Sequence, residues 1–217
     1  GNYIASDQLA LLPVTNKFIF LEEGDIAELN IEKVTIYDKD GIEVNRPIKT
    51  SKIKEGEVEL GNYKHFMQKE IFEQPQAIRD TLESRITKES VMVSAFGHKA
   101  RDIFKNIKQV QIVACGTSYN AGLVAKYWLE DITKIPCNVE VASEYRYRNP
   151  VILNDTLFVT VSQSGETADT LEALRTAKKI NNTIDTLCIC NCAESSITRN
   201  SDLTFLTHAG PEIGVAS

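Results

Sequence analysis

The second half of the chain alternates short, strongly apolar segments with segments of helical periodicity, and this rhythm limits the folds that it can adopt. The apolar segments have the composition of β-strands and cover residues 110–115, 138–141, 156–161, 186–190 and 203–206. The helical pattern covers residues 100–107, 121–132 and 168–180. Strands that are apolar on both faces and alternate with helices are typical of a parallel sheet covered on its two sides. The sequence therefore predicts an α/β domain, a flavodoxin-like sandwich around a parallel sheet.

The first 54 residues are rich in strand-like segments instead. Turn sequences at 22–24 and 39–41 predict two β-hairpins, which pair residues 17–21 with 25–29 and residues 34–38 with 42–45. So few strands cannot bury a full core alone. We expect them to be the end of a domain whose beginning is missing.

Two further segments lie between these regions. Residues 50–62 are rich in Lys, Glu and Gly without periodicity, which is typical of a linker. Residues 65–86 have helical periodicity, and Pro75 lies among them. We expect Pro75 to break this helix in two, because proline lacks the N–H group and its ring clashes with the preceding turn.

Hydroxyl-rich loops follow two of the predicted strands, at the edge of the sheet where α/β proteins bind ligands. Cys115–Asn120 follows the first strand, and Ser162–Thr167 follows the third. Each leads into a predicted helix, so free N–H groups and the positive end of the helix dipole would face a ligand. Gly116 and Gly165 allow the backbone to turn tightly and to approach that ligand closely.

These loops offer neutral hydrogen-bonding groups on the side chains of Thr117, Ser118, Ser162, Gln163, Ser164 and Thr167. Hydrogen bonds to a charged group contribute on the order of 1.5–3 kcal/mol each, so four or five would hold a phosphate without Lys or Arg. The simpler interpretation is that such hydroxyls only cap helices, at about 1 kcal/mol each. A cap needs one hydroxyl, whereas the second loop has three, and two such loops follow strands. We therefore favour a site for the phosphomonoester of a sugar phosphate.

Composition argues against several other classes of function. The net charge is −6 and the basic residues are scattered, whereas binding to a nucleic-acid backbone needs a basic stripe. No apolar run approaches the roughly 18 residues of a membrane helix. The sequence contains neither glycine-rich nucleotide-binding motif. We expect a cytoplasmic protein without nucleic acid or membrane as partner.

The five cysteines, an odd number, do not suggest a disulfide framework. Cys188, Cys190 and Cys192 would share one face of a strand, which is a poor geometry for tetrahedral zinc. We interpret these three as small buried hydrophobic residues and expect no metal and no cofactor. Cys115 is either a packing residue or a modifiable thiol, and Glu166 either begins a helix or acts in acid–base chemistry.

The two loops resemble the signature loops of the sugar isomerase (SIS) domain family. Nearly the whole chain is similar to the isomerising glutamine–fructose-6-phosphate aminotransferases, also called glucosamine-6-phosphate synthases. The further segments that carry this resemblance are Ile4–Asp7, Phe20–Ala27, His65–Ile71, Glu73–Pro75, Glu144–Arg148 and Glu212–Ser217.

The resemblance implies three parts of the chain. Residues 1–54 would be the C-terminal part of an α+β N-terminal-nucleophile glutaminase domain. Residues 55–75 would be an interdomain linker, and residues 76–217 the first SIS domain, truncated at its C-terminal end.

The resemblance also implies an activity. Such enzymes convert fructose 6-phosphate and glutamine into glucosamine 6-phosphate and glutamate for amino-sugar biosynthesis, and a homodimer is expected. The residues that would bind the substrate phosphate and sugar are Thr117, Ser118, Ser162, Gln163, Ser164 and Thr167, with Val215 near the sugar.

The family's reactive groups are not expected within these residues. Gly1 is not the N-terminal cysteine nucleophile of the glutaminase, and the segments that bind glutamine are absent. The second SIS domain is absent too, with the lysine, glutamate and histidine of the family's imine and proton-transfer chemistry. We therefore expect no catalytic residue here and no turnover by this stretch alone. Two alternatives stay open: another SIS-domain sugar-phosphate isomerase or deglycase, and a non-catalytic sugar-phosphate-binding regulator.

Overall fold

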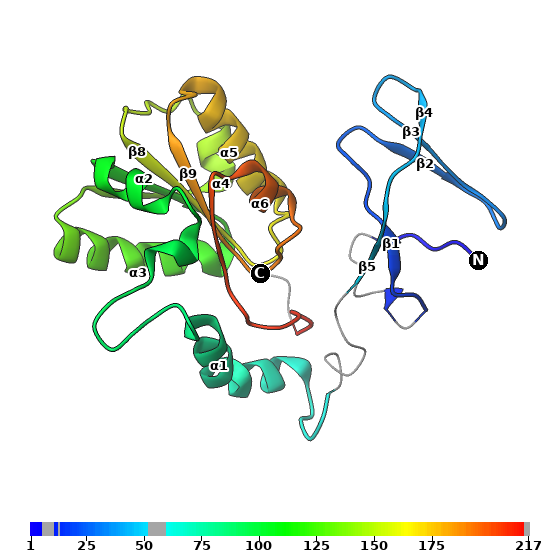
Figure 1. The fold of residues 1–217 in the computed structure, drawn as a ribbon, viewed down its shortest axis with the longest axis horizontal. Coiled ribbons are helices and arrows are strands. Elements are labelled where there is room, and N and C mark those ends of the chain that lie inside the picture. Colours follow the sequence, from blue (N-terminus) through cyan, green and yellow to red (C-terminus); the bar gives the residue numbers. More distant parts are fainter. Residues whose placement is uncertain (6–10, 13, 52–59, 215–217) are drawn as a thin grey trace. The chain divides into compact units, whose positions relative to one another are not determined.

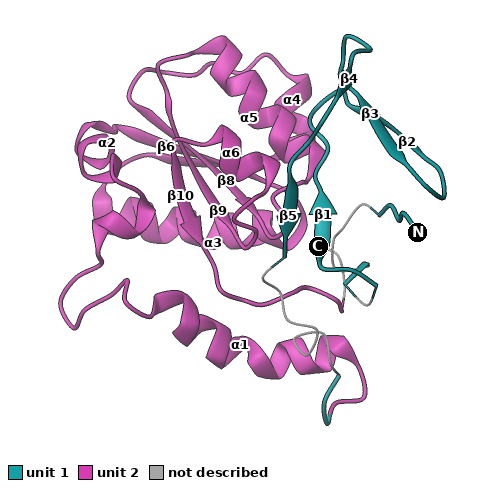
Figure 2. Ribbon diagram, turned by 45° about the vertical axis from the view of Figure 1, so that its right-hand side comes forward, with its two compact units in different colours: residues 1–62 teal, residues 63–217 magenta. Residues whose placement is uncertain are grey.

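The computed structural model describes residues 1–5, 11–12, 14–51 and 60–214. The chain forms two compact units, residues 1–62 and residues 63–217 (Figure 2). Most of the predicted linker, residues 52–59, lies outside the described residues. The domain boundaries expected at residues 54 and 75 therefore stay a prediction.

Unit 1 consists of two small antiparallel sheets. In one, β1 (Lys17–Ile19) pairs with β5 (Ile48–Thr50). In the other, β3 (Val34–Tyr37) lies between β2 (Ile26–Leu29) and β4 (Glu43–Val44).

One of the two predicted hairpins of unit 1 is confirmed and the other is wrong. Segment 34–38 pairs with 42–45 as expected, and the Asp38 Oδ1 accepts the N–H groups of Asp40 and Ile42 in the turn. Segment 17–21 does not pair with 25–29, because β2 pairs with β3 instead. The Asn30 Oδ1 closes that unexpected turn by accepting the N–H groups at positions 32 and 33. The Asx turn at residues 30–33 therefore joins two paired strands, whereas the glycine turn at residues 22–24 does not.

Unit 2 contains a parallel sheet of five strands in the order β10-β9-β8-β6-β7. Figure 1 shows this sheet among its helices. The strands are β6 (Gln109–Ala114), β7 (Cys137–Val141), β8 (Thr156–Ser162), β9 (Asp185–Cys190) and β10 (Leu203–Leu206). This order, numbered from β6, is the 2-1-3-4-5 order of the flavodoxin-like fold. The α/β prediction is therefore confirmed.

Helices cover both faces of this sheet. They are α2 (Ala100–Asn106), α3 (Gly116–Thr133), α4 (Ala142–Tyr147), α5 (Ala168–Ile180) and α6 (Ser196–Asn200), with a 3-10 turn η3 (Val93–Phe96). One hydrophobic cluster joins α4, α5 and α6 to the sheet through Tyr145, Leu174 and Ile197. The other joins α2 and α3 to the opposite face through Ile103 and Leu129. Burial raises the pKa of Tyr145 to about 12, so this phenol stays protonated.

The expectation that Pro75 breaks the preceding helix is wrong. Helix α1 (Phe66–Leu82) runs through Pro75 without interruption. Proline costs an interior helix about 3 kcal/mol, so other interactions must hold the helix together. Contacts with the chain after β10, described below, are the candidates.

The cysteine interpretation is confirmed in part. Cys188 and Cys190 are buried in the same hydrophobic cluster, and burial raises the pKa of the Cys188 thiol. Cys192 is exposed, because β9 ends at Cys190 and the chain turns away before position 192. Within the described residues, no helix is both long and apolar enough to span a membrane.

An ion pair in unit 1 yields a test of this part of the fold. The Asp25 side chain is 1% exposed and accepts bonds from the Arg46 Nε at 2.9 Å and the Arg46 Nη2 at 2.8 Å. These bonds, with one from the N–H of Glu22, lower the pKa of Asp25 to about 2. A lowered pKa stabilises the fold above pH 3.8, and this stabilisation disappears as the pH falls through about 2.

We predict that Arg46→Met raises the pKa of Asp25 toward 3.8, as measured by carboxyl-carbon NMR titration. The matched control is Lys33→Met, which removes the exposed pair with Glu43 and should leave the Asp25 titration unchanged. An Asp25 pKa that stays near 2 in Arg46→Met would contradict the pairing.

Candidate functional site

The two hydroxyl-rich segments emerge from neighbouring strands at the same edge of the sheet. Strands β6 and β8 pair in parallel, with Ala114 opposite Val161. Neighbouring strands are about 4.8 Å apart, so the chain leaves both strands at adjacent points. Helix α3 follows β6 on one face, and α5 follows β8 on the other. The parallel sheet thus meets the geometric requirement for a shared site.

The first segment is shorter than expected, because α3 begins at Gly116 rather than at residue 121. Gly116 has a φ of +54°, which a residue with a side chain rarely adopts. Thr117 and Ser118 therefore lie in the first turn of the helix. Within the described part of the chain, neither hydroxyl has a hydrogen-bond partner. Cys115 is the N-cap residue and makes no side-chain bond to the helix.

The second segment, the Ser162–Thr167 loop, is organised by its own hydroxyl groups. The buried Ser162 Oγ accepts the N–H of Gly165 at 3.0 Å and lies 3.1 Å from the Thr167 Oγ1. The Ser164 Oγ accepts the N–H of Glu166 at 3.2 Å. Thr167 is the N-cap residue of α5, yet its side chain makes no capping bond. Simple capping therefore does not explain these hydroxyls, and the first turn of α5 keeps its main-chain donors for a ligand.

Cys115 links the first segment to helix α5. Its Sγ lies 3.9 Å from the Thr170 Oγ1, near the start of α5, in a weak sulfur contact. The side chain also packs against the hydrophobic cluster that α5 helps to form. The packing interpretation of Cys115 therefore accounts for its surroundings.

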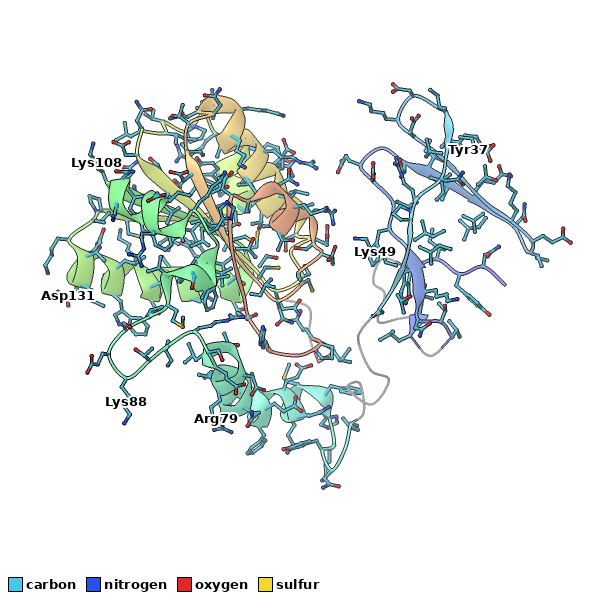
Figure 3. All side chains as sticks on the ribbon, in the orientation of Figure 1. Tyr37, Lys49, Arg79, Lys88, Lys108 and Asp131 are labelled. Carbon is cyan, nitrogen blue, oxygen red and sulfur yellow. The ribbon has the colours of Figure 1, made fainter. Side chains whose placement is uncertain are left out.

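At this edge of the sheet, the side chains proposed to bind an anion are neutral. The basic residue just before β6, Lys108, lies at the opposite end of that strand (Figure 3), where it pairs with Asp155 at 2.6 Å. The carboxylate of Asp169, in the first turn of α5, would repel an anion. The Arg146 Nη1 lies 2.7 Å from the Asp169 Oδ1 and offsets that charge. The described residues contain no group of His, Cys, Asp and Glu that could hold a metal ion.

Residues 191–197, which follow β9, form hydrogen bonds with the Ser162–Thr167 loop. The carbonyl of Gln163 accepts the N–H of Asn191 at 3.1 Å, and the carbonyl of Gly165 accepts the N–H of Ile197 at 3.0 Å. The Glu166 Oε1 accepts the N–H of Ser196 at 2.7 Å, at the start of α6. Glu166 therefore stabilises a helix end, although of α6 rather than of the helix that follows it in sequence.

Gly165 packs closely against Cys190 and Ser195. Its φ is +67°, and an added Cβ would lie 2.1 Å from the Ser195 Oγ and 2.7 Å from the Cys190 Sγ. Asn191 and Ser195 are not predicted from the sequence, because both precede a five-residue helix that no periodicity reveals. The serine at 195 was the available signal, since its side chain caps α6.

Of the seven residues predicted to bind substrate, six lie on the two segments just described. Ser162, Gln163, Ser164 and Thr167 share one loop, and Thr117 and Ser118 share the first turn of α3. Val215 lies outside the described residues.

Comparison with known proteins gives a consistent result. The sequence model of the SIS domain family matches residues 103–217. The isomerising glutamine–fructose-6-phosphate aminotransferase of Idiomarina loihiensis is 56% identical over 216 residues, which are 100% of this chain and 35% of that protein. The chain thus spans about a third of the length of the curated relatives that it matches.

Solved structures agree with this result. The C-terminal domain of glucosamine–fructose-6-phosphate aminotransferase from Francisella tularensis matches with a TM-score of 0.70 and 50% identity, over 74% of this chain and 44% of that one. A glucosamine-6-phosphate deaminase from Thermotoga maritima matches with a TM-score of 0.50 and 26% identity, over 64% of this chain and 39% of that one.

We predict that Gly165→Ala destabilises unit 2 by about 1–3 kcal/mol, because the new methyl group collides with Ser195 and Cys190. Urea unfolding followed by circular dichroism measures this loss. Gly210→Ala is the matched control, because Gly210 has a similar φ of +74° but open space around its Cβ position. Equal losses in both variants would show that backbone strain, not the collision, is responsible.

Proposed function

The chain belongs to the SIS domain family, and we propose that it supplies the fructose-6-phosphate-binding part of an isomerising glutamine–fructose-6-phosphate aminotransferase. The proposal is supported most by one arrangement. Two helices begin at the same sheet edge, with neutral hydroxyl groups in their first turns or in the loop before them. Such an arrangement suits a phosphate monoester, because helix starts bind anions through main-chain N–H groups.

Within this site we assign the phosphate to the Ser162–Thr167 loop and the first turn of α3. Ser164 already accepts a bond from a main-chain N–H group, so its hydroxyl proton remains to be donated to a phosphate oxygen. Ser162 and Thr167 share one hydrogen bond, so this pair keeps one hydroxyl proton for the same purpose. Thr117, Ser118, Gln163 and Thr167 complete the set, and Val215 contacts the sugar.

The whole enzyme needs parts that these residues do not provide. Glutamine is bound and hydrolysed by a glutaminase domain, of which residues 1–54 are the C-terminal part. Residues 55–75 form the linker, and residues 76–217 the first SIS domain. The enzyme acts in the cytoplasm as a homodimer, and its product is glucosamine 6-phosphate. The 52–57% identity to the aminotransferases, which includes unit 1, supports this assembly.

A second candidate is a deaminase acting on glucosamine 6-phosphate, as the name of the Thermotoga maritima protein indicates for that protein. Its structure covers 64% of this chain, at 26% identity. The aminotransferases match 100% of the chain at about twice that identity, so the first candidate is better supported.

We predict that fructose 6-phosphate, but not fructose, raises the melting temperature of this chain, because fructose lacks the phosphate group that the site binds. Ser118→Ala should weaken fructose 6-phosphate binding at least tenfold, since a lost bond to a charged group costs about 1.5–3 kcal/mol. Ser90→Ala, in the exposed segment before η3, is the control and should bind normally. Equal stabilisation by fructose would refute a phosphate site.

We also predict that the 217-residue chain forms no glucosamine 6-phosphate from fructose 6-phosphate and glutamine or ammonia. The reason is that the residues assigned here hold the substrate and move no proton. A coupled assay for the product, with a full-length relative as positive control, measures this. Product formation by the chain alone would show that a catalytic group lies within it.

A further inference from the structure

The chain that leaves β10 runs along helix α1. We refer to residues 207–214 as the strap; Figures 1 and 2 both show the chain passing from β10 toward α1. The N–H of His208 donates to the Thr81 Oγ1 at 2.8 Å, near the end of α1. The N–H groups of Ile213 and Gly214 donate to the Glu70 Oε1, near its start. The strap is therefore antiparallel to α1.

The length of the strap matches the distance between its two contacts on α1. Glu70 and Thr81 are eleven residues apart in a helix, which is about 16 Å. Five residues from His208 to Ile213 reach about 17 Å when fully extended. The strap is therefore long enough to reach both attachments on α1.

Asn191 fixes the other side of the strap. Its Oδ1 accepts the Thr207 hydroxyl at 3.1 Å and the N–H of Ala209 at 2.9 Å. Its Nδ2 donates to the carbonyl of Gly210 at 2.7 Å. The main-chain N–H of the same residue donates to the carbonyl of Gln163, in the Ser162–Thr167 loop. Asn191 therefore joins the strap directly to the loop proposed to bind phosphate.

Glu70 holds the far end of the strap. One oxygen of its carboxylate accepts two consecutive N–H groups, both at 2.8 Å. An added Cβ on Gly214 would lie 2.8 Å from the N atom of Met67, so the strap touches the backbone of α1 here. Glu70 is half-buried in this contact, which favours charge-assisted hydrogen bonds.

We propose that Asn191 and Glu70 are positioning residues that hold the strap as the wall contacting the sugar part of the ligand. This inference rests on the proposed function. A phosphate bound by the Ser162–Thr167 loop leaves the sugar beside that loop, and Asn191 keeps the strap there. The bonds to Thr81 and Asn191 use the N–H groups of His208 and Ala209 and the carbonyl of Gly210. Residues 208–210 are exposed, so their other main-chain groups can reach a ligand. The strap then selects for the sugar, while the loop binds the phosphate.

Calorimetric titration of the 217-residue chain with fructose 6-phosphate and with inorganic phosphate tests this division. In Glu70→Ala and in Asn191→Ala, the preference for fructose 6-phosphate over phosphate should fall about tenfold, or about 1.4 kcal/mol. Phosphate affinity should stay within about twofold, because the main-chain bond from residue 191 to Gln163 survives both substitutions.

Two further variants make the result decisive. Glu73→Ala removes a carboxylate on the same helix that pairs with Lys69, and it should keep the full preference. Glu70→Gln keeps the accepting oxygen and should retain more of the preference than Glu70→Ala. The proposal is overturned if the preference is unchanged in both alanine variants, if both ligands lose affinity equally, or if Glu70→Gln loses as much as Glu70→Ala. Absence of binding by the unmodified chain would instead refute the proposed function.

Discussion

The parallel pairing of β6 with β8 is the interaction on which the candidate site depends. Its register is fixed because β8 is buried on both faces: Phe158 belongs to the cluster under α4 and α5, and Val159 to the cluster under α2 and α3. A slip by one residue would exchange these two side chains between the clusters. Because the register is secure, Ala114 lies opposite Val161 and both helices begin at one edge. The hydrophobic core therefore determines where the polar groups meet.

A site made of neutral donors depends more on geometry than a site made of lysines and arginines. Hydrogen bonds to an ionised group are about twice as strong as neutral ones, but they weaken steeply when misaligned. Two contacts keep the Ser162–Thr167 loop aligned: Gly165 packs directly on Ser195, and Glu166 forms a hydrogen bond with the start of α6. Arg146 contributes by pairing with Asp169, whose charge would otherwise oppose an anion. We infer that rigidity replaces positive charge at this edge.

Sequence reasoning succeeded where burial is periodic and failed where distant contacts decide the structure. Helix α5 has the predicted bounds, 168–180, because its apolar face repeats with a helical period. The hairpin 17–29 was wrong, because β1 finds its partner about thirty residues away in β5. The strap has no periodicity at all, and its partner Glu70 is 143 residues from Ile213 in the sequence. No local pattern encodes such a contact, so the positioning residues could not be predicted.

The continuity of helix α1 through Pro75 has a consequence for the strap. Pro75 lies between Glu70 and Thr81, the two attachments of the strap on this helix. A break at Pro75 would change their separation and would therefore disturb the bonds of the strap. Conversely, the bonds to Glu70 and Thr81 lie on both sides of the proline and favour the unbroken helix. The cost of proline in the helix is thus opposed by the same contacts that fix the wall of the proposed sugar site, so helix and strap stabilise each other.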